Sequence, residues 1–192
     1  MKIRNTCRVC NSALETILDL GEHYDSDFPN PDDLPGSKAP LEMALCKRCR
    51  LLQLRHTVDP NEMYRNYWYK SGTNQTMRDA LADIANKAET VIHLKDGDAV
   101  LDIGCNDGTR TFHRFSDDRI SRVIGLEYNQ QLVERANSQF GNTKFSFYQM
   151  DVDRDSFSAD LQKLCAEPED REFDLICLSF VLMHLHDGEK LL

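Results

Sequence analysis

From position 97 onward, short apolar runs alternate with segments in which apolar residues recur every three or four positions. Short apolar runs flanked by polar or glycine residues are typical of buried strands, and the longer period is typical of helices that bury one face. The pattern predicts strands over 99–103, 122–127, 144–149 and 173–179, and helices over 109–116, 130–139 and 156–166. Strands that alternate with helices in this way form an α/β fold with a doubly wound parallel sheet.

The last predicted strand is wholly apolar from Leu175 to Leu178. It would be an exposed sheet edge if nothing paired with it, and such edges are normally protected. Repeated right-handed crossovers are expected to build a larger sheet than the strands predicted here. We therefore expect residues 97–192 to be the N-terminal part of a domain whose sheet is completed by a missing segment or by a partner.

Residues 61–96 predict an aromatic linker followed by a helix. Apolar residues share one helical face between Gln75 and Leu94, namely Met77, Leu81, Ile84, Ala88 and Val91. Before this helix, Tyr64, Tyr67, Trp68 and Tyr69 crowd together. Such a cluster suits an aromatic plug between two domains or the wall of a ligand pocket, because Tyr and Trp bury a ring and keep a polar tip wet.

Residues 1–60 predict a small irregular module that is too polar to bury much core. Two C-x2-C pairs stand in it, Cys7 with Cys10 and Cys46 with Cys49. Four thiolates from two such pairs form a closed tetrahedral site, and metal is the usual stabiliser of small modules. We expect structural zinc without catalysis; iron bound in the same way, or reduced thiols, is the alternative.

Charge and composition narrow the functional classes. The chain has 32 Asp and Glu against 23 Lys and Arg, a net charge of −9, which disfavours nucleic acid and anionic membranes as partners. It lacks an apolar stretch long enough for a membrane span, and its first residues lack a signal-peptide core. We expect a cytoplasmic protein whose seven cysteines are reduced, with Cys165 and Cys177 as small apolar core residues.

The turn after the first predicted strand reads Gly104-Cys105-Asn106-Asp107-Gly108. Its glycines allow close approach of a ligand to the backbone, and Glu127 ends the next strand where a carboxylate can accept both hydroxyls of a ribose. A diphosphate would not suit Asp102 and Asp107, whereas S-adenosylmethionine carries a sulfonium, an ammonium and a ribose but no phosphate. The alternative is an ordinary strand–turn–helix connection without a ligand.

Several motifs together resemble a known family, the S-adenosylmethionine-dependent C-methyltransferases of nucleotide-linked deoxysugars, which have an N-terminal zinc-binding domain. The matching segments are both cysteine pairs, Leu18-Asp19-Leu20-Gly21, Ala39-Pro40-Leu41-Glu42, Leu51-Leu52-Gln53-Leu54, Tyr67-Trp68-Tyr69-Lys70-Ser71-Gly72 and the glycine turn. The resemblance is dense from residue 7 to about 110. It implies a Rossmann-like class I methyltransferase fold and methylation of a carbon next to a keto group.

The resemblance also implies roles for single residues. The methionine part of the cofactor would be held by Asp102, Gly104, Cys105 through its backbone, Asn106 and Gly108. Glu127 would bind the ribose, Asp151 the adenine amine, and His184 would act as the base. The cleft would be lined by Tyr69, Ser71 and Gly72 on the cofactor side and by Tyr64 and Tyr67 on the substrate side.

Some of these residues have simpler explanations, and the chain departs from the family at two points. Asp151 could cap the following helix, and His184 could be a structural loop histidine. Met183 stands where many members have a polar or acidic neighbour of the histidine, and the family continues well past Leu192. The alternative functions are O- or N-methylation of another small molecule, and a non-catalytic module that binds the cofactor or a partner.

Overall fold

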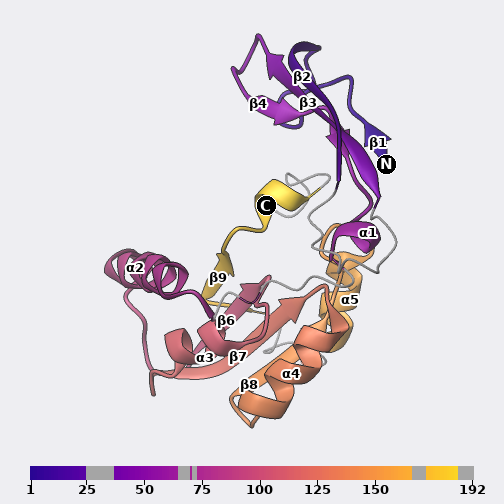
Figure 1. Cartoon of the computed structure of the whole chain (residues 1–192). Coiled ribbons are helices and arrows are strands. Elements are labelled where there is room, and N and C mark those ends of the chain that lie inside the picture. Colours follow the sequence, from indigo (N-terminus) through magenta and orange to yellow (C-terminus); the bar gives the residue numbers. More distant parts are fainter. Residues whose placement is uncertain (25–36, 65–69, 71–72, 166–171, 186–192) are drawn as a thin grey trace. The chain divides into compact units, whose positions relative to one another are not determined.

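The computed structural model of this chain describes residues 1–24, 37–64, 70, 73–165 and 172–185. The chain divides into two compact units, residues 1–67 with 186–192 and residues 68–185. Figure 1 labels the elements of both. The first unit contains antiparallel sheets and the second a parallel sheet.

The second unit is built on a parallel sheet with the strand order β8-β7-β6-β9. Its strands are β6 (Asp98–Ile103), β7 (Ile120–Glu127), β8 (Phe145–Gln149) and β9 (Leu175–Leu178). The helices between them are α3 (Thr109–Phe115), α4 (Gln130–Phe140) and α5 (Phe157–Leu164). These are the elements predicted from the hydrophobic pattern, with their ends moved by one or two residues.

One face of this sheet and the helices α3 and α4 enclose the core. Val100, Val123, Phe145 and Leu175 lie side by side in the register of the four strands, and Val133 of α4 packs on the same cluster. Figure 1 shows α3 and α4 beside the strands β6, β7 and β8 that they connect. The carboxyl ends of β6 and β7 therefore meet at one edge of the sheet, above this core.

Helix α2 (Gln75–Ile92) precedes β6, as predicted, but the predicted face is only partly buried: Met77 and Ala88 are half-buried. Ile84 and Val91 are 42% and 78% exposed. Ile92 and Leu94, at the end of the helix and just beyond it, pack against the core instead. The period identified the helix correctly, whereas contact with the core decided which apolar residues it buries.

The β9 strand pairs with β6 along one edge, and within the described ranges no strand pairs with its other edge. Ile176 in this strand is 53% exposed. The predicted apolar edge strand is thus present, followed by a short 3-10 helix, η3 (Leu182–His184).

The first unit is more regular than its composition indicates. Strands β2 (Leu14–Tyr24), β3 (Lys38–Cys46) and β4 (Leu52–Leu54) form an antiparallel sheet in this order. A short ladder joins β1 (Lys2–Ile3) to β5 (His56–Thr57), and α1 (Pro60–Tyr64) follows. Almost all of β2 is exposed, so this sheet has little apolar core of its own.

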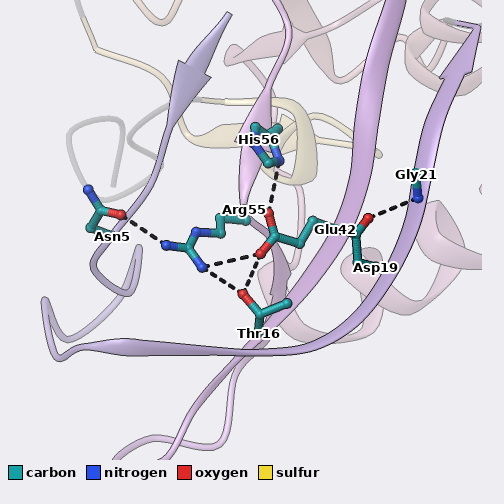
Figure 2. Close-up of polar contacts among 7 residues, drawn as sticks. All are labelled: Asn5, Thr16, Asp19, Gly21, Glu42, Arg55 and His56. Atoms are coloured by element: carbon teal, nitrogen blue, oxygen red, sulfur yellow. Dashed lines mark hydrogen bonds and ion pairs between the residues drawn. The ribbon is translucent and has the colours of Figure 1, made fainter.

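A polar network takes the place of such a core on one face of the β2–β3 hairpin (Figure 2). The Glu42 carboxylate accepts hydrogen bonds from Thr16 and from Arg55, the latter over 3.2 Å, and its other oxygen lies 3.6 Å from His56 Nδ1. Arg55 also donates to Asn5 Oδ1 over 3.2 Å. Glu42 thereby ties β5 to the hairpin, and Arg55 links this network to the N-terminal segment.

Among the described residues, no helix is both long enough and apolar enough to cross a membrane.

Candidate functional site

The glycine turn joins the end of β6 to the start of α3. The amides of Gly104 and Cys105 both donate to the carbonyl of Leu126, over 2.8 and 3.0 Å. Gly104, Asn106 and Gly108 have φ values of 76°, 54° and 73°. This left-handed conformation is open to glycine and tolerated by asparagine, so the sequence of the turn fits its backbone.

Protein atoms occupy the space that side chains would need at both glycines. A Cβ at Gly108 would lie 2.7 Å from the Cβ of Ala136 and 3.1 Å from the ring of Phe147. A Cβ at Gly104 would overlap a methyl group of Val181, in the loop after β9. The glycines therefore allow close packing of α4, β8 and the β9–η3 loop on the turn, in addition to any approach of a ligand.

Asp102 is the first acidic group at this edge of the sheet. It is 5% exposed, and its Oδ2 accepts a 2.6 Å hydrogen bond from the hydroxyl of Thr111 in α3. Burial raises the pKa of the Asp102 carboxyl, while the Thr111 hydrogen bond and the guanidinium groups of Arg114 and Arg110 oppose this shift. Its charge is therefore costly and only partly compensated.

Glu127 is the second acidic group. Its two oxygens accept the backbone amides of Asn129 and Asn106, each over 3.0 Å. Burial raises the pKa of Glu127, and the hydrogen bonds from Asn129 and Asn106 oppose the shift. Because Asp102 pairs with Gly125 and side chains alternate along a strand, Asp102 and Glu127 project from the same face of the sheet.

The remaining polar groups of the turn add no cation. Asp107 is 3% exposed, and its Oδ1 accepts the amide of Thr109 over 3.3 Å. Cys105 is also buried, and burial together with the Asp102 and Glu127 charges raises the pKa of its thiol well above the ordinary value. The turn and the ends of β6 and β7 thus combine three carboxyl groups with a neutral thiol, a setting that suits a cationic or amine-bearing ligand better than a phosphate.

Asp151 follows β8, the strand that pairs with β7, and Glu127 is the last residue of β7. The amide of Met150 donates to the Glu127 carbonyl over 2.9 Å, which places the start of this loop beside β7. Asp151 Oδ1 accepts the amide of Asp153, and Oδ2 lies 3.3 Å from Arg154 Nε. The N-cap of α5 is Ser156, so the alternative expectation that Asp151 caps this helix is wrong.

His184 ends η3, three residues after Val181, the residue that packs on Gly104. Its loop is therefore adjacent to the glycine turn, although the two are far apart in sequence. Partial burial lowers the pKa of the His184 imidazole. Met183 is 64% exposed.

The other predicted ligand-binding residues belong to the linker region. Tyr64 is half-buried at the end of α1 in the first unit. Tyr67, Tyr69, Ser71 and Gly72 lie outside the described residues. Their predicted roles remain predictions.

The four cysteines of the first unit form one cluster. Their Sγ atoms all lie within 4.8 Å of one another, with 3.5 Å between Cys7 and Cys49 and 3.4 Å between Cys10 and Cys46. Sulfur atoms around a tetrahedral zinc at about 2.3 Å are ~3.8 Å apart, so the donor set fits this ion. Hydrogen bonds from Ser12 lower the pKa of Cys10 to about 6, whereas burial and the other three thiols raise the pKa of Cys49 to about 12.

The backbone around the two pairs is equivalent. The amide of Asn11 donates to the Cys7 carbonyl over 3.1 Å, and the amide of Arg50 donates to the Cys46 carbonyl over 2.8 Å. Asn11 and Arg50 also share a left-handed conformation, with φ values of 54° and 66°. Two tight turns of the same kind thus present two thiols each to a common centre.

Two residues of the candidate site were missed by the sequence analysis. Asn129 is 3% exposed and caps α4, while its amide holds Glu127. An asparagine just before a predicted helix is a recognisable cap signal and could have been found. Thr111 carries no such signal, because its contact with Asp102 depends on how α3 packs against β6.

Comparisons with known proteins agree with this geometry. Residues 7–64 match the family model of a putative zinc binding domain, and residues 101–192 match that of a methyltransferase domain. The C-methyltransferase NovU of Streptomyces niveus is 28% identical over 139 residues, which cover 69% of this chain and 32% of NovU. The juvenile hormone acid O-methyltransferase of Bombyx mori is 27% identical over 124 residues, which cover 64% of this chain and 41% of that enzyme.

Among solved structures, the YcgJ protein of Bacillus subtilis aligns with a TM-score of 0.43 and 23% identity, over 59% of this chain and 42% of YcgJ. The chain spans about a third to two fifths of the length of the curated relatives it matches. With the parallel sheet, the glycine turn and the cysteine cluster in place, the second unit has a Rossmann-like α/β fold and matches a methyltransferase domain, and the first unit matches a putative zinc binding domain.

Proposed function

We propose that this protein binds S-adenosylmethionine at the glycine turn and methylates a carbon next to the keto group of a nucleotide-linked deoxysugar. The observation that carries the cofactor assignment is a pair of carboxylates, the buried Asp102 and the partly buried Glu127, on one face of the sheet beside the turn. Buried carboxylates favour a ligand that brings a positive charge and hydroxyl donors. S-adenosylmethionine, when bound, supplies the methyl group from its sulfonium.

In this assignment, the parts of S-adenosylmethionine lie along the carboxyl edge of the sheet. Asp102 and the turn residues Gly104, Cys105, Asn106 and Gly108 hold the methionine part. Glu127 accepts the ribose hydroxyls with the lone pairs that the Asn106 and Asn129 amides leave free. Asp151 receives the adenine amine, and Tyr69, Ser71 and Gly72 complete the cofactor side of the cleft.

His184 is the proposed base. It takes the proton from the substrate carbon next to the ketone, which leaves the carbon nucleophilic. Its lowered pKa keeps the imidazole neutral at neutral pH, as a base must be. C-methylation is supported by the NovU match, and the deoxysugar class by the motifs that resemble such C-methyltransferases. Tyr64 and Tyr67 are the proposed substrate contacts.

We assign a structural role to zinc at Cys7, Cys10, Cys46 and Cys49. Four thiolates leave no open coordination position, so the ion would hold the first unit together and take no part in methyl transfer.

Calorimetric titration of S-adenosylmethionine into the zinc-loaded protein tests the cofactor site. We expect saturable binding that the Asp102→Ala, Glu127→Ala double variant loses. Thr90→Val is the control, because Thr90 is an exposed α2 residue whose hydroxyl donates to the Lys87 carbonyl in its own helix. Binding that the double variant retains would contradict the assignment.

Deuterium exchange tests the base and the substrate class together. In D2O, nucleotide-linked keto-deoxysugars should exchange the hydrogen next to the ketone without any methyl transfer, and His184→Gln should abolish the exchange. The matched control is His113→Gln, since His113 is an exposed residue of α3. Exchange should fall as pH drops through the lowered pKa of His184, below 6.5.

A second candidate, O-methylation of another small molecule, is favoured by the match to the juvenile hormone acid O-methyltransferase. Cofactor binding without hydrogen exchange on any keto sugar, but with turnover of a hydroxyl or carboxyl acceptor, would support it. Cofactor binding without any turnover would support the non-catalytic module.

A further inference from the structure

The hydroxyl of Thr111 is the one side-chain donor to Asp102 among the described residues, over 2.6 Å to Oδ2. Thr111 is fully buried at 0% exposure, and Asp102 is 5% exposed. Within the described part of the chain, Oδ1 accepts no hydrogen bond, and it is not fully enclosed, so it keeps some exposure to solvent. One oxygen is therefore fixed from inside the protein, and the other is presented outward.

We propose that Thr111 is a positioning residue for the cofactor: it holds Asp102 by Oδ2 so that Oδ1 receives the ammonium of the methionine part. This inference rests on the proposed function, in particular on S-adenosylmethionine as the ligand. A carboxylate group rotates freely when neither oxygen is bound, and a buried hydrogen bond to one oxygen removes that freedom before the ligand arrives.

The charges around Asp102 explain why a hydroxyl is suited to this task. Arg110 and Arg114 stabilise its charge from α3, while Glu127 on β7 repels it. The neighbouring thiols of Cys105 in the turn and Cys177 on β9 have raised pKa values, so they stay neutral and add no negative charge beside Asp102.

A neutral donor such as Thr111 fixes the carboxylate without cancelling its charge. An arginine or lysine in direct contact would compete with the ligand ammonium for the same carboxylate. Arg114 is instead engaged elsewhere, since its Nη1 donates to Ser179 Oγ over 3.4 Å.

Two ligands separate positioning from a general structural role. S-adenosylhomocysteine carries the amino-acid part, and methylthioadenosine has the same adenosine and sulfur without it. Thr111→Val keeps the shape of the side chain and removes the donor. We expect it to weaken S-adenosylhomocysteine by roughly tenfold, the cost of one hydrogen bond to a charged group, and to leave methylthioadenosine unchanged. Thr111→Ser, which keeps the hydroxyl, should restore binding.

The pH dependence of binding is the second measurement. Loss of the donor raises the pKa of Asp102, so Thr111→Val should move the acid limit of S-adenosylhomocysteine binding to higher pH, whereas Thr90→Val should not.

Equal loss of both ligands in Thr111→Val would overturn the proposal, because it would mean that the site has collapsed. Unchanged S-adenosylhomocysteine binding would overturn it as well. Failure of the unmutated protein to bind either ligand would instead refute the proposed cofactor site on which this inference rests.

Discussion

Gly125 lies in the middle of β7, where a glycine normally weakens a strand. A Cβ there would lie 2.5 Å from the ring of Phe147 and 2.9 Å from Cys105 Sγ. The residue is therefore small because the turn and β8 converge on it. At this position packing, rather than backbone conformation, requires glycine.

Gly125→Ala should lower the free energy of unfolding by about 1–3 kcal/mol, the usual cost of overpacking a filled core. Urea unfolding measures the change. In a Phe147→Leu background the added methyl group meets fewer atoms, so the same substitution should cost less. An equal cost in both backgrounds would contradict the packing explanation.

Asp102 lowers the stability of the fold, although it is proposed to bind the cofactor. Its folded pKa is raised above the unfolded value of 3.8, so folding is most favourable when Asp102 is protonated, and stability falls as pH rises from 3.8 through the folded pKa. Asp102→Asn removes this buried charge. We expect it to raise the free energy of unfolding by about 1 kcal/mol at pH 7 and to abolish cofactor binding.

The gain from Asp102→Asn should vanish below pH 3.8, where the unmutated side chain is neutral too. Unfolding curves of both proteins at pH 7 and at acid pH provide the comparison. A variant less stable than the parent at pH 7 would show that Asp102 supports the fold rather than ligand binding.

Among the elements, the two cysteine turns depend most on something other than apolar packing. The β2 strand is exposed almost throughout, and Cys7, Ala44 and Cys46 are the buried apolar residues described in the first unit. A unit with so small a core needs a metal or another cross-link.

Removal of metal with a strong chelator should therefore unfold residues 1–64 and leave the parallel sheet folded. Limited proteolysis followed by mass spectrometry would show cuts confined to the first unit. Cys46→Ser should reproduce this pattern, and Cys177→Ser, a change in β9, should not. Four thiols that react rapidly in the metal-loaded protein would argue against a four-cysteine metal site.

For the whole molecule, the division into two units predicts that a bound cofactor stabilises one unit and leaves the stability of the other unchanged. S-adenosylhomocysteine at a hundred times its dissociation constant stabilises the state it binds by about 2.7 kcal/mol. If the cofactor site lies in residues 68–185, only the amides of that unit should gain protection from hydrogen exchange when the ligand is added. A uniform gain of protection that includes β2 and β3 would contradict a site within the second unit.

The sequence by itself determined the features that depend on short segments. The strands and helices of residues 98–164 follow from local periodicity, and the positive φ values at Gly104, Asn106 and Gly108 follow from residues that tolerate them. The cysteine pairs are equally local, since each needs a single tight turn. These features depend on residues that are close together in the sequence, so they can be predicted without knowledge of the tertiary structure.

Tertiary structure alone decided the contacts between distant segments. The pairing of Thr111 with Asp102, the packing of Val181 on Gly104 and the exposure of Val91 depend on how helices and loops settle on the sheet. The strands of the first unit belong here too, because their long hairpin is held by the Glu42 network and little by apolar alternation. Such contacts leave no periodic trace, since packing selects partners by shape and burial rather than by distance along the chain.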